Sequence, residues 1–333
     1  MASGGNCAVT GSDGDHRLSA AIRKQIEQVD RRVMGGGGAY AAEREEIRRA
    51  SQIVKQLRTQ LELAKFLYTL NPGSGKPQLL LGFQSVRCGR VVLKVYGRSR
   101  PNEAAVQGFW ARASVSVVEV LAAGDNPVSW LLMPMISGFP PDLGDGTALT
   151  GALGQIMTTA HAVYSSDVGR RRDLHTGIAG HLGVALAALR RHGYALPDRW
   201  ESAAQRLYCS GAPTFLHGDL TPNNLLREPS GQLRLLDTCG YTGAAEFDGA
   251  RWCARVGGSQ RAVMLLDTWM RTESSLNARL ARTFLGLELL MEAGVRELMK
   301  EERRQSWERR DEETRRCLAL GARLAGFESA DTC

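Results

Sequence analysis

FLHGDLTPNNLL, at residues 215–226, decides the fold of this chain together with LRLLDTCG, at residues 233–240. Both stretches contain short apolar runs that are followed by polar residues, and a segment with turn character separates them. The sequence therefore predicts two strands joined in a hairpin, with a polar cluster beside each strand. The first cluster contains Asp219 and Asn224, and the second begins at Asp237.

These polar residues have the chemistry that phosphoryl transfer requires. A carboxylate beside an acceptor hydroxyl can orient the hydroxyl and take its proton. An amide oxygen and a second carboxylate can hold Mg²⁺, which prefers hard oxygen ligands. Asp219, Asn224 and Asp237 provide this set, because the hairpin would bring Asp237 back beside Asn224. The alternative is a polar hairpin whose side chains only cap the backbone.

HGDLTPNN resembles the HGDLHPGN motif of aminoglycoside phosphotransferases and choline-kinase-like small-molecule kinases, and more distantly the HRDLKPEN loop of protein kinases. The step from Asp219 to Asn224 is the same in all three, and LLDTCG stands where the family has a DFG-like segment. The resemblance implies an enzyme, an ATP- and Mg²⁺-dependent phosphotransferase with an alcohol group as acceptor. It implies that Asp219 is the catalytic residue and that Asn224 and Asp237 are metal ligands. Thr221 and Asn223 depart from the family's His and Gly.

The rest of the chain predicts an α+β, protein-kinase-like fold, with a small antiparallel β-rich N-terminal lobe and a larger helical C-terminal lobe. After a helix at 41–65, strands are expected at 66–70, 78–84, 91–97, 115–120 and 130–136. Helices are then expected at 148–164, 175–192, 198–208, 243–256, 259–271, 274–293 and 297–324.

This pattern predicts three parts. Residues 1–40, rich in Gly, Ser and Asp, are expected to be a flexible N-terminal segment, although a helix could form within them. Residues 41–137 are expected to form the nucleotide-binding N-terminal lobe with a leading helix. Residues 138–333 are expected to form the helical C-terminal lobe, which holds the catalytic loop and the acceptor site.

Lys94 lies in the third expected strand, VVLKVYG, inside an otherwise apolar run. A buried lysine is unfavourable unless it is paired or bound to phosphate. A kinase-like lobe needs a lysine here to hold the α- and β-phosphates, and Glu103, in the helix opened by Pro101, is the expected partner. Alternatively, the Lys94 side chain extends from an edge strand to solvent.

SWLLMPMISG, at residues 129–138, resembles the last N-lobe strand and the hinge of kinases. The resemblance implies that Met133 lies behind the adenine pocket. It also implies that the Pro134 carbonyl accepts from the adenine amino group and that the Ile136 amide donates to the ring. Proline lacks an amide proton, but none is needed at position 134.

GSGK, at residues 73–76, is not a Walker A motif. That motif requires a glycine where Leu70 stands and a serine or threonine where Pro77 stands. The segment is expected instead to be a loop that covers the nucleotide, with backbone amides that can touch phosphate oxygens.

Four further residues have expected roles outside the motif. Asp248, in AAEFDGARW, resembles a family aspartate that ties the following helix to the catalytic loop, a role close to that of a helix cap. His161, in TTAHAVY, is expected to be structural. Glu288 and Glu292 lie one helical turn apart, so they either face an acceptor cleft together or form an exposed helical face.

The expected acceptor is a small molecule, which can be cationic, such as an aminoglycoside-type antibiotic or an amino-sugar-like metabolite. One alternative is an atypical Ser/Thr protein kinase, which would need a peptide groove and an activation segment with an APE-like block. The short stretch GYTGAAEFDG has no such block. The other alternative is a non-catalytic pseudokinase or nucleic-acid-binding module. The charge is +7, but basic residues alternate with acidic ones at 300–316, which is typical of a solvated helix face and argues against nucleic acid.

Composition favours a cytoplasmic protein. The seven cysteines are scattered without a CxxC pair, which indicates free thiols. No apolar stretch approaches the length of a membrane span, and the N-terminus lacks a signal-peptide pattern, so no membrane partner is expected.

Overall fold

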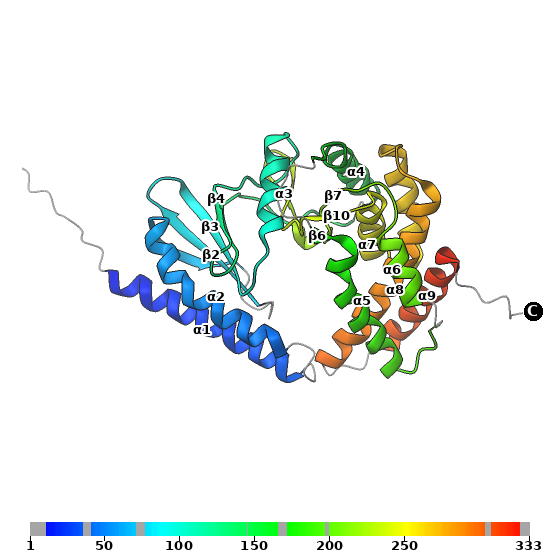
Figure 1. Cartoon of the computed structure of the whole chain (residues 1–333), viewed down its shortest axis with the longest axis horizontal. Helices are drawn as coiled ribbons and strands as arrows, with labels where there is room; N and C mark the ends of the chain where they lie inside the picture. The colour runs from blue at the N-terminus through cyan, green and yellow to red at the C-terminus, as the bar shows by residue number, and fades with distance from the viewer. Residues whose placement is uncertain are drawn as a thin grey trace, which may run out of the picture. The chain divides into compact units, whose positions relative to one another are not determined.

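The computed structural model describes residues 11–35, 41–70, 77–144, 146–165, 172–196, 200–303 and 308–326 (Figure 1). The GSGK segment lies outside these residues. The chain divides into two units. The first comprises Met1–Arg100 and Val120–Met135, and the second comprises Pro101–Glu119 and Ile136–Cys333.

A five-stranded antiparallel sheet forms the centre of the first unit, with the order β1-β2-β3-β5-β4 (Figure 1). Its strands are β1 Leu63–Thr69, β2 Gln78–Ser85, β3 Gly89–Tyr96, β4 Ala122–Gly124 and β5 Trp130–Pro134. β2 and β3 pair over their whole lengths, from Gln78 opposite Tyr96 to Ser85 opposite Gly89. The predicted antiparallel, β-rich N-terminal lobe is confirmed.

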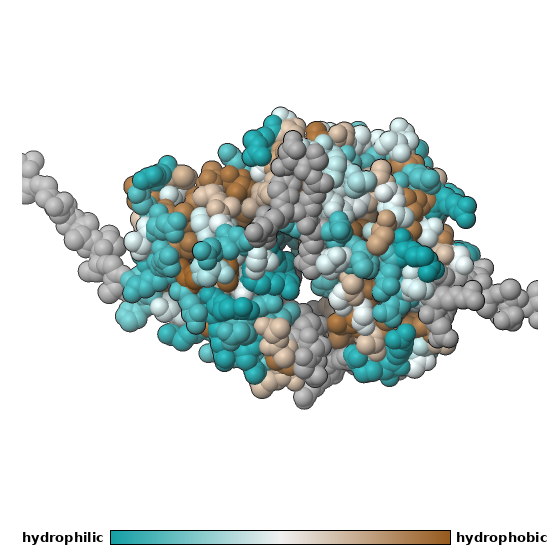
Figure 2. Space-filling model, viewed as in Figure 1, coloured by the Kyte–Doolittle hydropathy of each residue, from teal (hydrophilic) through white to brown (hydrophobic). Residues whose placement is uncertain are grey.

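Two helices, α1 Gly11–Gly35 and α2 Ala41–Gln60, lie side by side against this sheet (Figure 1). Within the segment 1–40, which the sequence suggests is flexible, residues 11–35 thus form a helix. The buried residues of α2 recur at helical spacing and join the core of the sheet: Ile47, Ala50, Ile53, Val54 and Leu57. The outward face of the helix pair is largely hydrophilic (Figure 2).

Two expectations for the first unit are wrong. The helix predicted at 41–65 ends at Gln60, because Glu62 has a φ of 52° and turns the chain into β1. The strand predicted at 115–120 is absent from the sheet. Instead, the Val118 amide donates to the Leu235 carbonyl at 3.2 Å, so this segment lies along the hairpin at residues 225–235 of the second unit.

The second unit is mainly helical, and its elements surround the hairpin at residues 225–235. Its helices are α3 Pro101–Arg112, α4 Gly146–Ala162, α5 Leu174–Arg191, α6 Trp200–Tyr208, the 3₁₀ turn η1 Pro222–Asn224, α7 Glu246–Thr272, α8 Ala278–Arg303 and α9 Glu308–Ala325. Its strands are β6 Arg172–Asp173, β7 Thr214–Leu216, β8 Leu225–Arg227, β9 Leu233–Leu235 and β10 Tyr241–Gly243. The strands form a three-stranded sheet, β6-β10-β7, and the hairpin β8-β9.

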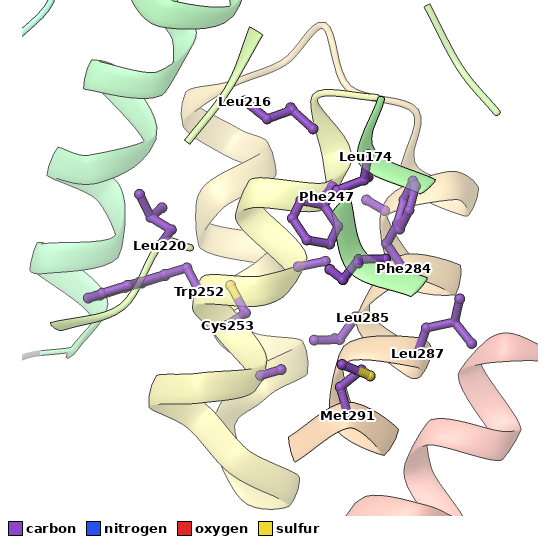
Figure 3. Packing of buried hydrophobic residues seen from close by; sticks show 14 of the residues in the cluster. Leu174, Leu216, Leu220, Phe247, Trp252, Cys253, Phe284, Leu285, Leu287 and Met291 are labelled. Atoms are coloured by element: carbon purple, nitrogen blue, oxygen red, sulfur yellow. The ribbon is translucent and has the colours of Figure 1, made fainter. Parts of the chain in front are cut away.

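The core of the second unit lies where α5, α7 and α8 meet, and Figure 3 shows Phe247, Phe284 and Leu285 gathered there. The rings of Phe247 and Phe284 have centroids 6.0 Å apart at 79°, a favourable edge-to-face arrangement. Apolar side chains thereby pack α7 against α8.

Two glycines explain where the helix predictions succeed and fail. Helices were predicted to meet near 257–258, and α7 has a non-helical residue there, Gly258, with a φ of 54°. A break was also predicted near Gly294, but α8 continues through it. A Cβ on Gly294 would lie 2.6 Å from the Ala185 carbonyl oxygen, so this glycine allows close packing of α5.

Among the described residues, no helix is long and apolar enough to cross a membrane.

We predict that Gly97→Ala destabilises the protein by undocking α2 from the sheet. A Cβ at this position would lie 1.9 Å from the Glu46 backbone oxygen in α2, and backbone cannot move aside as a side-chain tip can. Overpacking of this kind costs about 1–3 kcal/mol or more. Urea unfolding should show this loss, whereas Gly183→Ala, with open space around an exposed helical site, should be neutral or stabilising. Equal effects of the two substitutions would contradict the packing.

Candidate active site

The β8-β9 hairpin brings the two polar clusters together, as the sequence predicts. Leu225 pairs with Leu235, and the Leu236 amide donates to the Asn224 carbonyl at 2.9 Å. Asp237 therefore follows directly on a residue that is hydrogen-bonded to Asn224. Asp237 has a φ of 56°, a left-handed conformation that Asp tolerates better than most residues.

The Asp219 carboxylate is held at both oxygens. The Asn224 amide group donates to Asp219 Oδ2 at 3.1 Å and to the Asp219 backbone carbonyl at 2.7 Å. The Arg251 guanidinium donates to Asp219 Oδ1 at 3.1 Å. The Asp219 side chain is still 31% exposed, so it can meet a molecule from solvent.

His217 joins the catalytic loop to the loop that follows Asp237. Its backbone carbonyl accepts from the Cys239 amide at 2.6 Å, and its Nε2 contacts the Leu236 carbonyl at 2.7 Å. Because a carbonyl only accepts, Nε2 carries the proton. Burial lowers the pKa of His217 despite the nearby carboxylates, so the ring is neutral and serves as a brace.

Asp248, in the first turn of α7, ties that helix to the catalytic loop, and this sequence prediction is confirmed. Its two carboxylate oxygens accept from the backbone amides of His217 at 2.8 Å and Gly218 at 2.9 Å. Asp248 is fully buried. Its charge also lies at a helix N-terminus, where the macrodipole stabilises anions.

His161 of α4 bridges Asp248 to a second buried carboxylate, so the structural role predicted for it is to join these two acidic side chains. Nε2 is 3.2 Å from Asp248 and Nδ1 is 2.6 Å from Glu273, while the Trp269 indole donates to Glu273 at 2.8 Å. Burial alone would lower the pKa of His161, but the hydrogen bonds to Asp248 and Glu273 raise it to about 9. The ring is therefore a cation that compensates two buried anions.

The start of α3 packs against the loop that carries Asp237. The Thr238 hydroxyl donates to the Glu103 carbonyl at 3.4 Å, and a Cβ on Gly240 would lie 2.5 Å from the Asn102 carbonyl oxygen. Glu103 is buried. The structure thus brings Glu103, assigned from the sequence as the partner of Lys94, close to the predicted metal loop.

Two of the predicted nucleotide contacts lie on strands of the first unit, Lys94 on β3 and Pro134 on β5. Lys94 is 2% exposed, which excludes a side chain extended to solvent, and its Nζ lies 4.8 Å above the Tyr96 ring. Pro134 ends β5, and Ile136 follows the strand rather than lying in it. The Lys94–Glu103 ion pair and the adenine contacts of Pro134 and Ile136 stay predictions.

Glu288 and Glu292 are buried, so the expectation of an exposed helical face is wrong. They face α7, where Arg251 donates to Glu288 at 2.8 Å and Arg255 forms a salt bridge with Glu292, with the charged atoms 2.8 Å apart. Burial raises the pKa of Glu288, although Arg251 opposes this. Sequence reasoning missed Arg251. Its four-residue spacing from Arg255 matches the spacing of the two glutamates, but only the packing of α7 on α8 shows that these pairs meet.

Residues 83–242 match the phosphotransferase enzyme family. The structure is similar to the choline kinase LicA from Streptococcus pneumoniae, with 16% identity and a TM-score of 0.57 over 82% of this chain and 98% of that one. It is also similar to an aminoglycoside phosphotransferase from Alicyclobacillus acidocaldarius, with 12% identity and a TM-score of 0.51 over 80% of this chain and 91% of that one. A third similar structure is a spectinomycin phosphotransferase in complex with ADP and spectinomycin, with 11% identity and a TM-score of 0.53 over 83% of this chain and 98% of that one. No curated protein matches the sequence. The resemblance to aminoglycoside phosphotransferases and choline kinases is confirmed. The predicted protein-kinase-like fold is confirmed as well.

We predict that His161 stabilises the fold in a pH-dependent way. Its pKa is raised from 6.5 to about 9, which corresponds to about 3 kcal/mol. Because the folded pKa lies above the unfolded one, this stability is present in full below pH 6.5 and is lost as the pH rises through about 9. Urea unfolding of wild type and His161→Gln from about pH 6 to about pH 10 measures the difference. A gap that stays constant would disprove the bridge, and exposed His16→Gln serves as the control.

Proposed function

We propose that this phosphotransferase-family chain uses ATP and Mg²⁺ to transfer a phosphoryl group to a hydroxyl of a small molecule. The observation that carries the proposal is the hairpin, which places Asp219, Asn224 and Asp237 in one polar site. The exposed part of the Asp219 carboxylate provides a place for the acceptor hydroxyl.

Asp219 would be the catalytic residue. Its carboxylate would orient the acceptor hydroxyl and take its proton as the hydroxyl oxygen bonds to the γ-phosphorus and the bond to the β,γ-bridging oxygen breaks. ADP leaves with the bridging oxygen, and the proton passes to solvent. The bonds from Asn224 and Arg251 hold the carboxylate in one orientation, which lowers the entropic part of the barrier.

Asn224 and Asp237 have the donor chemistry that Mg²⁺ requires. Both hydrogen bonds of the Asn224 side chain use its nitrogen, so its amide oxygen is turned away from Asp219 as a hard donor. In the described part of the chain, no group of three or more His, Cys, Asp or Glu side chains could hold a metal. Two protein oxygens suit Mg²⁺, which usually completes its coordination with water and substrate phosphates. When bound, Mg²⁺ would neutralise charge on the transferred phosphate.

The nucleotide would be held by Lys94, Glu103, Pro134 and Ile136. Lys94 would hold the α- and β-phosphates, with Glu103 as its ion-pair partner. The burial of both side chains supports this, because buried charges persist when they are paired. The Pro134 carbonyl and the Ile136 amide would hold adenine.

We infer that the acceptor is an aminoglycoside-type antibiotic or an amino-sugar-like metabolite, which would make the enzyme an antibiotic-resistance factor in the first case. Similar folds named for choline, aminoglycoside and spectinomycin support a small-molecule acceptor. Glu288 and Glu292 do not support an acidic pocket for a cation, because each is paired with an arginine. A peptide acceptor is disfavoured because only residues 238–245 separate Asp237 from α7. Free thiols at all five described cysteines are consistent with the cytoplasm.

We predict that Asp237→Asn removes the effect of Mg²⁺ on nucleotide affinity while the fold stays intact. Asn tolerates the left-handed backbone at this position better than Ala, so the substitution tests charge rather than strain. Loss of a metal carboxylate should weaken Mg²⁺-dependent ADP binding at least about tenfold, measured by calorimetry with and without Mg²⁺. Unchanged binding would remove Asp237 from the metal site.

We predict that Asp219→Asn abolishes most phosphoryl transfer but preserves folding and ATP binding. Asn keeps the shape and still accepts a hydrogen bond, but it cannot take a proton. The expected loss in kcat is about 10²- to 10⁴-fold, or about 3–5 kcal/mol of barrier. A panel of hydroxyl acceptors with ATP and Mg²⁺, followed by the mass shift of the product, identifies the substrate and measures the loss. The neighbouring exposed Asn223→Ala is the matched control. Near-normal transfer by Asp219→Asn would rule out the proposed chemistry.

A further inference from the structure

Arg251 forms a fork between Asp219 and a buried glutamate. One terminal nitrogen donates to Asp219 Oδ1 at 3.1 Å, and the other donates to Glu288 Oε2 at 2.8 Å. Asn224 holds the other Asp219 oxygen. The two restraints on the carboxylate therefore come from separate elements, η1 and α7, and together they limit rotation of the side chain.

Glu288 is itself fixed, so it can anchor the arginine. Its other oxygen accepts from the Tyr208 hydroxyl at 3.3 Å, and its side chain is 1% exposed. The Arg251 guanidinium lies 5.9 Å from the Phe247 ring, and Phe247 packs edge-on against Tyr208. The Arg251 and Glu288 side chains therefore have little conformational freedom left to lose when the acceptor binds.

We propose that Arg251, anchored by Glu288, is a positioning residue that sets the orientation of the Asp219 carboxylate for proton acceptance; this rests on the proposed function. A carboxylate must present one oxygen to the hydroxyl along the line of transfer. A misplacement of about 1 Å can reduce a rate by about 10²-fold. The planar guanidinium fork can hold two carboxylates in fixed relation, which a lysine cannot do.

A second arginine–glutamate pair serves as a control that distinguishes positioning of the Asp219 carboxylate from general stabilisation of the fold. Arg255 forms a 2.8 Å salt bridge with Glu292 and joins the same two helices one turn further along, but it is paired with Glu292 rather than with Asp219. The two pairs have the same residue types, and the second pair is more exposed: Arg255 is 27% exposed against 12% for Arg251, and its glutamate is 8% exposed against 1% for Glu288. The charged and titratable groups that interact with Arg251 include Asp219, the α8 residues Glu288 and Glu292, and Tyr208 of α6.

The experiment compares Arg251→Met, Glu288→Gln and the double variant with Arg255→Met/Glu292→Gln. The probe is transfer from ATP–Mg²⁺ to the acceptor found in the panel, or to water if none is found. Arg251→Met should lower kcat about 10²-fold with an unchanged KM for ATP, and should lower the melting temperature because Glu288 is left buried and unpaired. The double variant should recover the melting temperature but not kcat. Arg251→Lys should recover part of kcat, and the control pair should change kcat little.

Recovery of kcat together with stability in the double variant would overturn the inference, because a purely structural arginine would behave in that way. Crystal structures of wild type and of Arg251→Met/Glu288→Gln provide a measurement that needs no activity. If the Asp219 carboxylate keeps its orientation without Arg251, the inference is overturned even when transfer is observed. If the orientation changes as expected but the wild type transfers no phosphoryl group to any acceptor or to water, the proposed function alone fails.

Discussion

The second unit depends on one buried charge, that of Asp248. Its carboxylate takes up two backbone amides that the sharp turn at His217 and Gly218 cannot pair within a strand. A buried carboxylate is unfavourable without compensation, and here a protonated His161 and the N-terminus of α7 provide it. Because Asp248 lies in the first turn of α7 and also accepts from the turn at His217 and Gly218, its two hydrogen bonds join α7, with its arginines, to the loop that carries Asp219. The geometry around Asp219 follows from these two bonds.

Two buried histidines show how the surroundings set charge. His161 lies between two carboxylates, and its pKa is raised to about 9, whereas the pKa of His217 is lowered and its ring meets a carbonyl. The first histidine can therefore balance anions, and the second can brace the turn without adding charge near Asp219. Exchange of these two environments would leave a cation near Asp219 and two uncompensated anions in the core, so the fold depends on the difference between them.

The local motif was predictable because its chemistry is contained in adjacent residues. The spacing of Asp219 and Asn224, and the hairpin that returns Asp237, follow from short apolar runs and a turn, and the structure has them. The sequence did not reveal partners set by tertiary packing. The run at 115–120 is apolar enough for a strand, yet it pairs with β9 rather than with the five-stranded sheet. Gly294 suggests the end of a helix, but α8 continues through it and the glycine allows close packing against α5. Arg251 belongs to this second class, because its partners lie on different elements.

The arginine–glutamate pairs also change the electrostatic interpretation of the site. Glu288 and Glu292 alone would add two negative charges and favour a polycationic acceptor. With Arg251 and Arg255 beside them, these four side chains are formally neutral, and Asp219 contributes the net negative charge of the group. Under the proposed function, selection of an acceptor by charge would then depend on Asp219 and on the loop that carries Asp237. Shape and hydrogen bonding would have to distinguish one hydroxyl compound from another, because buried polar groups discriminate strongly against an acceptor that leaves them unpaired.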